Sequence, residues 1–301
     1  MNKKRLYPFD LLVLGYMAFL TVAILLFGRP LGDYADELLI NLMVIVIVLS
    51  VIRFLHSPKS GPELFLRLLY PAMLFLLFYK QTGGLMNLIF PEFLDYQLTA
   101  FEKSLFGVNP TLWLDSNMIH VWLTELLSLL YFAYYPLIYI FLLTLFFKKE
   151  YHLIKISVTA ICMTFFVSFP LFFLYPIEGP RYFFAGMYTN ELTGPFFHPL
   201  VELAQRGAVH GGCMPSTHFG VALVIMFLCL KYYKKAGIML IPVVIGLALG
   251  TFYDRYHYVS DVIVGGVIGL AALFVTLRFI KFDEDDISLR NKNRKKISYV
   301  S

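Results

Sequence analysis

The sequence predicts an all-α integral membrane protein with about eight transmembrane helices. The first observation is composition: 59% of the 301 residues are hydrophobic and 15% are charged, whereas a soluble domain carries about a quarter charged residues. The second is a series of long apolar segments, and the third is that basic residues gather between alternate segments. Together these features indicate that lipid is the main solvent of the folded chain.

Eight segments are apolar over roughly the 17–25 residues that a helix needs to cross a hydrocarbon core about 30 Å thick. They cover residues 9–28, 38–55, 64–78, 122–147, 153–175, 216–230, 237–252 and 259–280, and the third and sixth are short. Each is expected to be helical, because unpaired backbone groups cost several kcal/mol in hydrocarbon. The first follows basic residues as a signal peptide would, but no small-residue cleavage site follows it, so we expect a retained span.

The distribution of positive charge predicts the orientation. With eight spans, one side of the membrane holds 19 of the 25 Lys and Arg residues, in the N-terminus, the tail from Arg278, and the loops 53–67, 148–155 and 231–235. Since basic residues mark the cytoplasmic side, both termini are predicted to be cytoplasmic, in a cell membrane of bacterial type. The basic tail 281–301 is then an orientation signal that contacts anionic membrane lipids, and no nucleic-acid partner is expected.

The outer side holds two long segments, 79–121 and 176–215. In the first, four apolar residues fall at helical spacing among polar ones: Leu94, Leu98, Phe101 and Leu105. This pattern fits an outer interfacial helix with its apolar side toward the lipid, and it fits equally a helix that covers the bundle. No internal repeat divides the chain, and the three cysteines have neither a disulfide pattern nor a zinc-binding spacing.

Three outer segments carry polar residues that a connecting loop does not need. They are residues 176–182, 211–218 and 254–261, and the predicted topology brings all three to the same face of the membrane. A functional site is therefore expected where they meet.

The second segment has the features of an anion site at a helix N-terminus. Pro215 suits the first turn of a helix, because its missing N–H would have no partner there. The N–H groups near Ser216 and Thr217, with the helix dipole behind them, can bind an anion, and His218 can donate a proton to it. A capped helix with a histidine that reaches the interface is the alternative explanation.

The third segment places His257 and Asp261 four residues apart, on one face of a helix. A carboxylate on one ring nitrogen fixes the tautomer and makes the other nitrogen a better nucleophile or base. In the first segment, Arg181 offers a planar fork suited to phosphate oxygens. Each feature alone also fits an interface anchor or a surface ion pair, but together they supply a nucleophile, an acid, an orienting group and a phosphate cradle.

The order of these motifs resembles the type-2 phosphatidic acid phosphatase superfamily. Its second signature, Pro-Ser-x-His, matches at Pro215, Ser216 and His218, and the catalytic half of its third, His-x3-Asp, matches at His257 and Asp261. The resemblance covers roughly residues 95–277.

The chain departs from the family pattern at two basic positions. The first signature, Lys-x6-Arg-Pro, is kept only at Arg181, with Leu174 in place of the lysine, and the Ser-Arg pair of the third signature is replaced by Gly250-Thr251. Arg255 is our candidate for a replacement. The stretch from Tyr256 to Asp261 is similar to the inositol phosphorylceramide synthase branch, whose third motif runs His-His-Tyr-x-x-Asp.

The resemblance implies a fold and a reaction. The fold is a six-helix phosphatase-type catalytic bundle, with N-terminal transmembrane helices in residues 1–80, a catalytic domain in 81–280 and the tail in 281–301. His257 would attack phosphorus to form a phosphohistidine, Asp261 would hold its ring, and His218 would protonate the leaving oxygen. Phosphate would be bound by a set of four residues: Arg181, Ser216, Thr217 and Arg255. The substrate would be a phospholipid or prenyl (di)phosphate ester, and neither a metal nor another cofactor is expected.

Three alternatives remain open at this stage. Hydrolysis and transfer of the phosphoryl group to a lipid alcohol, as in inositol phosphorylceramide synthesis, share these residues. A non-catalytic carrier of an anionic lipid would use the same polar cluster, but it predicts ionisable groups near mid-membrane. A structural scaffold is the third, since Gly246-x3-Gly250 and Gly265-x3-Gly269 fit close helix packing. The oligomeric state is not predicted.

Overall fold

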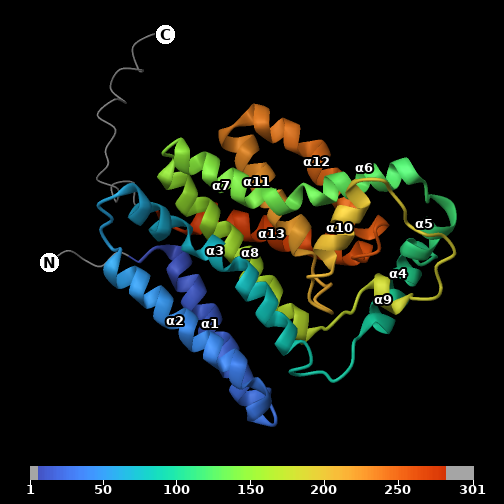
Figure 1. Ribbon diagram of the computed structural model, residues 1–301, viewed down its shortest axis with the longest axis horizontal. Helices are drawn as coiled ribbons and strands as arrows, with labels where there is room; N and C mark the ends of the chain where they lie inside the picture. The colour runs from blue at the N-terminus through green and yellow to red at the C-terminus, as the bar shows by residue number, and fades with distance from the viewer. Residues whose placement is uncertain (1–5, 283–301) are drawn as a thin grey trace.

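The computed structural model describes residues 6–282, and this part of the chain contains helices and no strand (Figure 1). The basic residues Lys3 to Arg5 and nearly all of the predicted tail, 283–301, lie outside the described residues. The helices are α1 (Pro8–Phe27), η1 (Leu31–Tyr34), α2 (Ala35–Phe54), α3 (Gly61–Leu85), α4 (Asp95–Phe106), α5 (Pro110–Asn117), α6 (Val121–Phe132), α7 (Tyr134–Phe147), α8 (Tyr151–Leu174), α9 (Pro180–Phe183), α10 (Phe197–Gln205), α11 (Thr217–Tyr232), α12 (Lys234–Tyr253) and α13 (Val259–Phe279).

Seven helical segments are long and apolar enough to cross a membrane, which confirms the prediction of an all-α integral membrane protein. They coincide with the predicted spans except the sixth, and α6 and α7 together form one of them, Val121–Phe147. The sixth predicted span is α11, a shorter apolar helix of 16 residues. The third is longer than predicted, because the Ser60 hydroxyl accepts the Glu63 N–H and starts α3 at Gly61.

Both ends of the described chain lie at one end of the bundle. Leu6 and Tyr7 line the same cavity as Ile280 and Phe282. A chain that begins and finishes on one side has crossed an even number of times, so α11 counts as a crossing together with the seven longer spans. Eight spans therefore agree with the geometry.

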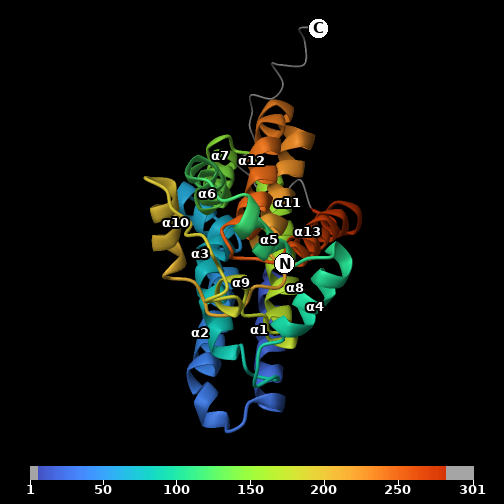
Figure 2. The same ribbon diagram turned by 90° about the vertical axis from the view of Figure 1, so that its right-hand side faces the viewer.

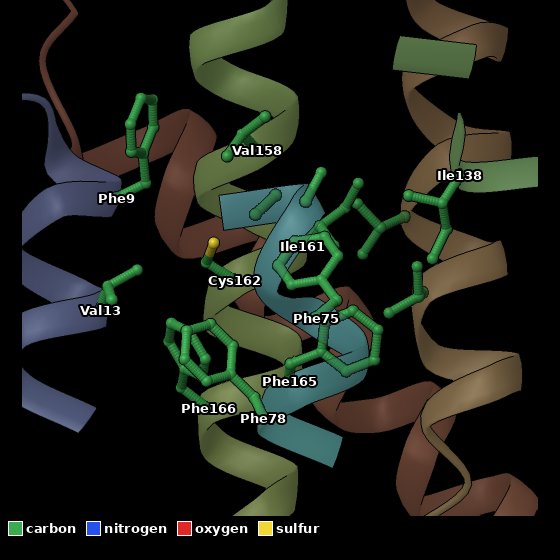
Figure 3. Close-up of a cluster of buried hydrophobic side chains, with 14 of the residues drawn as sticks. Phe9, Val13, Phe75, Phe78, Ile138, Val158, Ile161, Cys162, Phe165 and Phe166 are labelled. Carbon is green, nitrogen blue, oxygen red and sulfur yellow. The ribbon is translucent and has the colours of Figure 1, made fainter. Parts of the chain in front are cut away.

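An aromatic core surrounds α8, the most buried of the spans (Figure 3). Phe165 of α8 packs against Phe75 of α3 with ring centroids 4.8 Å apart, and Phe166 stacks on Tyr16 of α1 at 4.5 Å. Offset and tilted ring pairs of this kind add to the stability gained from burial. Figure 1 and Figure 2 show α1 and α2 side by side, extending away from the remaining helices.

A buried ion pair joins α1 to α3 near the end that holds Leu6. The guanidinium of Arg67 donates to both carboxylate oxygens of Asp10, at 2.8 and 2.5 Å, and the Tyr70 hydroxyl donates to the same carboxylate at 2.7 Å. Arg67 and Asp10 are both fully enclosed. Because breaking such a pair leaves an uncompensated charge, this contact fixes the relative position of the two helices.

The helix predicted for the outer interface is α4, and its acidic side packs on the bundle. Asp95 and Glu102 are buried, whereas Tyr96, Phe101 and Leu105 are exposed. The helix therefore packs on the bundle with its acidic residues and Leu98, which is buried, and turns Tyr96, Phe101 and Leu105 outward. The expected covering helix and the expected interfacial helix thus each describe one side of α4. The polar side is buried because it meets backbone N–H groups of the segments described next.

Candidate active site

The three predicted segments meet at the end of the bundle opposite Leu6, where α4, α5, α9 and α10 also gather (Figure 1). The Cys213 N–H donates to the Ile177 carbonyl at 3.2 Å, joining the first segment to the second. The Ser216 N–H donates to the Asp261 carbonyl at 3.0 Å, joining the second to the third. The predicted convergence is thus found in the structure.

Glycines allow α11, which carries His218, to touch α13, which begins two residues after His257. An added Cβ on Gly265 of α13 would lie 2.1 Å from the Ser216 carbonyl oxygen, and one on Gly220 of α11 would lie 2.5 Å from the Gly265 carbonyl oxygen. Cβ atoms do not approach backbone oxygens so closely, so only glycine permits this crossing. The predicted packing role of Gly265-x3-Gly269 is therefore correct, and the contact lies directly below the site.

His218 and His257 face each other across a small pocket. Their ring centroids are 5.7 Å apart and the rings are inclined by 65°. The pocket has a volume of about 60 Å³, and both histidines line it together with Arg181, Thr217 and Tyr256. The two imidazoles are in edge-to-face contact and line the same pocket, so one phosphate group bound there could reach both.

His257 is held by backbone and side-chain contacts. Its backbone N–H donates to the Thr251 carbonyl at 3.0 Å. Its ring nitrogen Nδ1 lies 3.5 Å from Oδ2 of the buried Asp261. The same Oδ2 accepts the Tyr258 N–H at 2.8 Å and the Cys213 thiol at 2.7 Å. Asp261 therefore orients the whole turn that carries His257, and its contact with the ring is the longest of the three.

Cys213, His257 and Asp261 are also the side chains within residues 6–282 that could share a metal ion, since their ligand atoms lie within 4.8 Å of one another. Burial raises the pKa of the Cys213 thiol, which keeps it protonated. It acts in this structure as a hydrogen-bond donor to Asp261.

His218 lies in a cage of aromatic rings. Tyr131, Tyr134 and Tyr135 surround it at centroid distances of 5.4, 4.5 and 6.3 Å. Its Nδ1 is buried and makes no hydrogen bond to the described residues. These rings hold the imidazole in place by packing, and His218 still lines the pocket.

The N-terminus of α11 differs from the prediction in two respects. The helix begins at Thr217 with Ser216 as its N-cap, so Pro215 precedes the first turn and does not lie within it. The Ser216 N–H is already bonded to the Asp261 carbonyl, so this amide is not available to an anion. The Ser216 hydroxyl is buried and makes no hydrogen bond to the described residues. Thr217, the first residue of α11, lines the pocket.

Arg181 lines the pocket but is already paired. Its guanidinium donates to Oε2 of Glu202 at 2.8 Å and lies over the Tyr256 ring at 5.6 Å from the centroid. The Tyr256 hydroxyl donates to Oε1 of the same glutamate at 2.8 Å. Glu202 therefore positions both donors and offsets the positive charge of the arginine.

Arg255, the proposed replacement for the missing basic residues, lies outside this pocket. It donates to Oδ1 of Asp115 and to the Asn190 carbonyl, both at 2.6 Å, and packs on the Tyr188 ring at 3.8 Å. Its φ of 66° belongs to the left-handed region, which turns the side chain toward α5 although His257 follows two residues later. Burial alone would raise the pKa of Asp115, but the donors on Thr189, Asn190 and Arg255 hold it below its usual value.

Sequence reasoning missed the contribution of α10. Gln205 of this helix lines the pocket and donates to the Tyr131 hydroxyl at 2.6 Å, beside the Glu202 contacts described above. The N-terminus of α10 is fixed by Glu125 of α6, whose carboxylate accepts three consecutive N–H groups. Phe197, Val201 and Ala204 at helical spacing could have predicted the helix, but not the direction of its polar side chains.

The fold and the site together define an integral membrane protein with a paired-histidine pocket at one end of a helical bundle. The model of the PAP2 superfamily matches residues 96–275, and the chain belongs to this superfamily.

One curated relative is similar over part of the chain. It is a PA-phosphatase related-family protein of Dictyostelium discoideum, 29% identical over 129 residues, which make up 41% of this chain and 22% of the relative. The chain thus matches about a fifth of the length of this relative. No solved structure matches this chain.

Proposed function

We propose that this protein is a lipid phosphatase or phosphotransferase that works through a phosphohistidine at His257. One observation carries the proposal: two imidazoles, 5.7 Å apart, line one pocket of phosphate size. The substrate proposed is a phospholipid or prenyl (di)phosphate ester.

The reaction proposed has two steps. Nε2 of His257 attacks phosphorus, the bond from phosphorus to the leaving oxygen breaks, and His218 gives that oxygen its proton. In the second step a water molecule, or the hydroxyl of a lipid alcohol, gives its proton to His218 and attacks the phosphohistidine, which frees His257. The contact between His257 and Asp261, 3.5 Å in this structure, would shorten as the ring becomes positively charged, since catalytic hydrogen bonds often tighten only in complexes.

Charge on the phosphoryl oxygens would be stabilised by Arg181 and by the amides that begin at Thr217. The proposal gives Ser216 a packing role at the helix crossing, and it gives Arg255 a positioning role through Asp115. No metal enters this mechanism, because the donors are all protein groups.

The orientation belongs to the same proposal. Both termini would be cytoplasmic and the site would lie at the outer face of a bacterial cell membrane. The division into residues 1–80, 81–280 and 281–301 remains part of it, although α3 runs across residue 80 and Tyr79 lines the pocket.

Hydrolysis and transfer differ in the acceptor of the second step. The likeness to inositol phosphorylceramide synthases favours transfer of a phospho-headgroup to a lipid alcohol. Incubation of the purified protein with a labelled phospholipid, with and without a lipid alcohol, separates the two reactions: a new lipid product indicates transfer, and release of a water-soluble phosphate indicates hydrolysis.

A carrier of anionic lipid is supported less well. It predicts ionisable groups near mid-membrane, whereas in the described spans the charged residues lie close to helix ends. Arg67 and Asp10 pair near one end, and Glu125, near the other end, holds α10.

The test is the variant His257→Ala. We expect turnover of phosphatidic acid and prenyl diphosphates to fall about 10⁴-fold or more, because the nucleophile is lost. Acid-labile ³²P on the wild-type protein, absent from the variant, would identify the intermediate. The matched control is His56→Ala, an exposed histidine at the other end of the bundle. Wild-type turnover by His257→Ala, properly folded in detergent, would rule the proposal out.

A further inference from the structure

A second cavity adjoins the histidine pocket and has a different character. It has a volume of about 190 Å³ and lies between α3, α7, α8 and α10. Its apolar lining includes Phe75 and Leu76 of α3, Ile138 of α7 and Phe165 of α8, three of which appear together in Figure 3. Three of these helices, α7, α8 and α10, belong to the matched region of the superfamily, but α3 precedes it.

The cavity adjoins the catalytic pocket along a shared wall. The two share five lining residues: Tyr79, Gln205, Ala208, Thr217 and His218. Of the two histidines, His218 borders both spaces, whereas His257 lines only the smaller pocket. In the proposed reaction His218 protonates the leaving oxygen, so the cavity lies on the side of the leaving group.

The mouth of the cavity lies on a lipid-facing surface. Leu76 and Tyr139 line it and are 62% and 46% exposed, whereas Phe75, Ile138 and Phe165 at its base are buried. Leu76 is nine residues before the end of α3 at Leu85, which corresponds to about 13 Å along a helix. The opening is therefore expected below the surface of the membrane, in contact with hydrocarbon.

The volume limits what can enter. An apolar cavity of about 150 Å³ holds one benzene molecule, so about 190 Å³ has room for one chain of roughly seven or eight carbon atoms. A second chain would not fit beside it. The aromatic walls exclude water and offer contact to a flat or extended chain.

We infer that this cavity binds the first seven or eight carbons of a single hydrocarbon chain that belongs to the leaving group of the substrate. The inference rests on the proposed function and adds to it the class of substrate. The lipid alcohol departs through the cavity into the bilayer, and the phosphoryl group stays on His257. Residues of α3, outside the matched region, set the width of the cavity and with it the selectivity for the chain.

The test compares alkyl phosphates of increasing length, from about four to about ten carbons, below their critical micelle concentrations. In the wild-type protein kcat/KM is expected to rise with each added carbon and to level off near eight carbons, where the cavity is full. Leu76→Trp fills the mouth. We expect the ratio of kcat/KM for the eight-carbon ester to kcat/KM for the four-carbon ester to be at least about tenfold smaller in this variant than in wild type. The matched control is Met73→Trp, on an exposed position of the same helix outside the cavity.

A second variant on the opposite wall, Ala204→Leu of α10, guards against misfolding of the first and is expected to shift the plateau to shorter chains. Equal chain-length profiles for wild type, Leu76→Trp and Ala204→Leu would overturn the inference while leaving the proposed function intact. If wild type neither hydrolysed any ester, including the chain-free para-nitrophenyl phosphate, nor transferred its phosphoryl group to an added lipid alcohol, the proposed function on which the inference rests would instead be removed.

Discussion

At the scale of single residues, Asp254 shows how burial changes the charge of the site. Its Oδ2 accepts the Ser128 hydroxyl at 3.0 Å, and its Oδ1 is buried without a hydrogen-bond partner among the described residues. Burial raises the pKa of Asp254 to about 8, although the Ser128 bond opposes the shift. At pH 7, which is below this value, the protonated form of the carboxyl group predominates.

This pKa predicts a dependence of stability on pH. Because the folded pKa lies above the unfolded value of about 3.9, the contribution of Asp254 to stability is complete below about pH 4 and is lost as pH rises through about 8. Asp254→Asn mimics the neutral acid. Between pH 6 and 9 in detergent, we expect the melting temperature of wild type to fall by several degrees more than that of the variant. Parallel curves for the two proteins would contradict the assignment.

At the scale of elements, two carboxylates of α4 hold segments that form the pocket. The Asp95 carboxylate accepts the N–H groups of Glu178 and Gly179 at 2.7 and 2.9 Å, and the Tyr258 hydroxyl at 2.8 Å. Glu102 accepts the N–H and hydroxyl of Ser260 at 2.7 and 2.9 Å. One helix therefore holds the turns on both sides of the pocket, which include the neighbours of Arg181 and His257.

Asp95→Asn tests this positioning role of α4. The amide keeps the size of the side chain but replaces one acceptor oxygen by a donor that faces another donor, which costs about 1–3 kcal/mol for a buried group. We expect a lower melting temperature and a fall in kcat of about tenfold, with a smaller change in KM. Glu92→Gln is the control, since Glu92 is an exposed carboxylate three residues earlier. Equal effects of the two substitutions would show that α4 does not position the site.

At the scale of the whole molecule, the crossing of α11 and α13 sets the distance between the histidines. Gly220, Gly265 and Gly269 let the two backbones meet, with added Cβ atoms within 2.1–2.5 Å of opposing carbonyl oxygens. The crossing lies inside the membrane-spanning part, whereas His218 and His257 lie at its end. Helix packing within the bilayer therefore affects the distance between the two histidines at its surface.

Gly265→Ala is expected to separate the helices. Since displacement of a catalytic group by about 1 Å can cost about 100-fold in rate, we predict a loss of that order in kcat with the protein still folded. Gly15→Ala of α1 is the matched control, because an added Cβ there meets no atom within 4 Å, and it should leave kcat unchanged. Full activity of Gly265→Ala would show that the crossing tolerates a methyl group.

Much of this arrangement was accessible from the sequence, because it depends on local rules. Apolar length predicts spans, basic loops predict their alternation, and both together predicted that the segments around Arg181, His218 and His257 would meet. The two glycine pairs predicted close packing for the same reason, since small residues at a spacing of four lie on one helix face.

Tertiary structure alone decided which polar groups face the pocket. Arg255 is two residues from His257 but is turned away by Asp115, which is 140 positions distant in the chain, and Glu202 and Gln205 enter from a helix whose polar side gives no signal of its direction. The number and order of the spans can be predicted from hydrophobicity, because each span is a continuous apolar segment of the chain. Side-chain direction follows from contacts between distant segments, which no local pattern records.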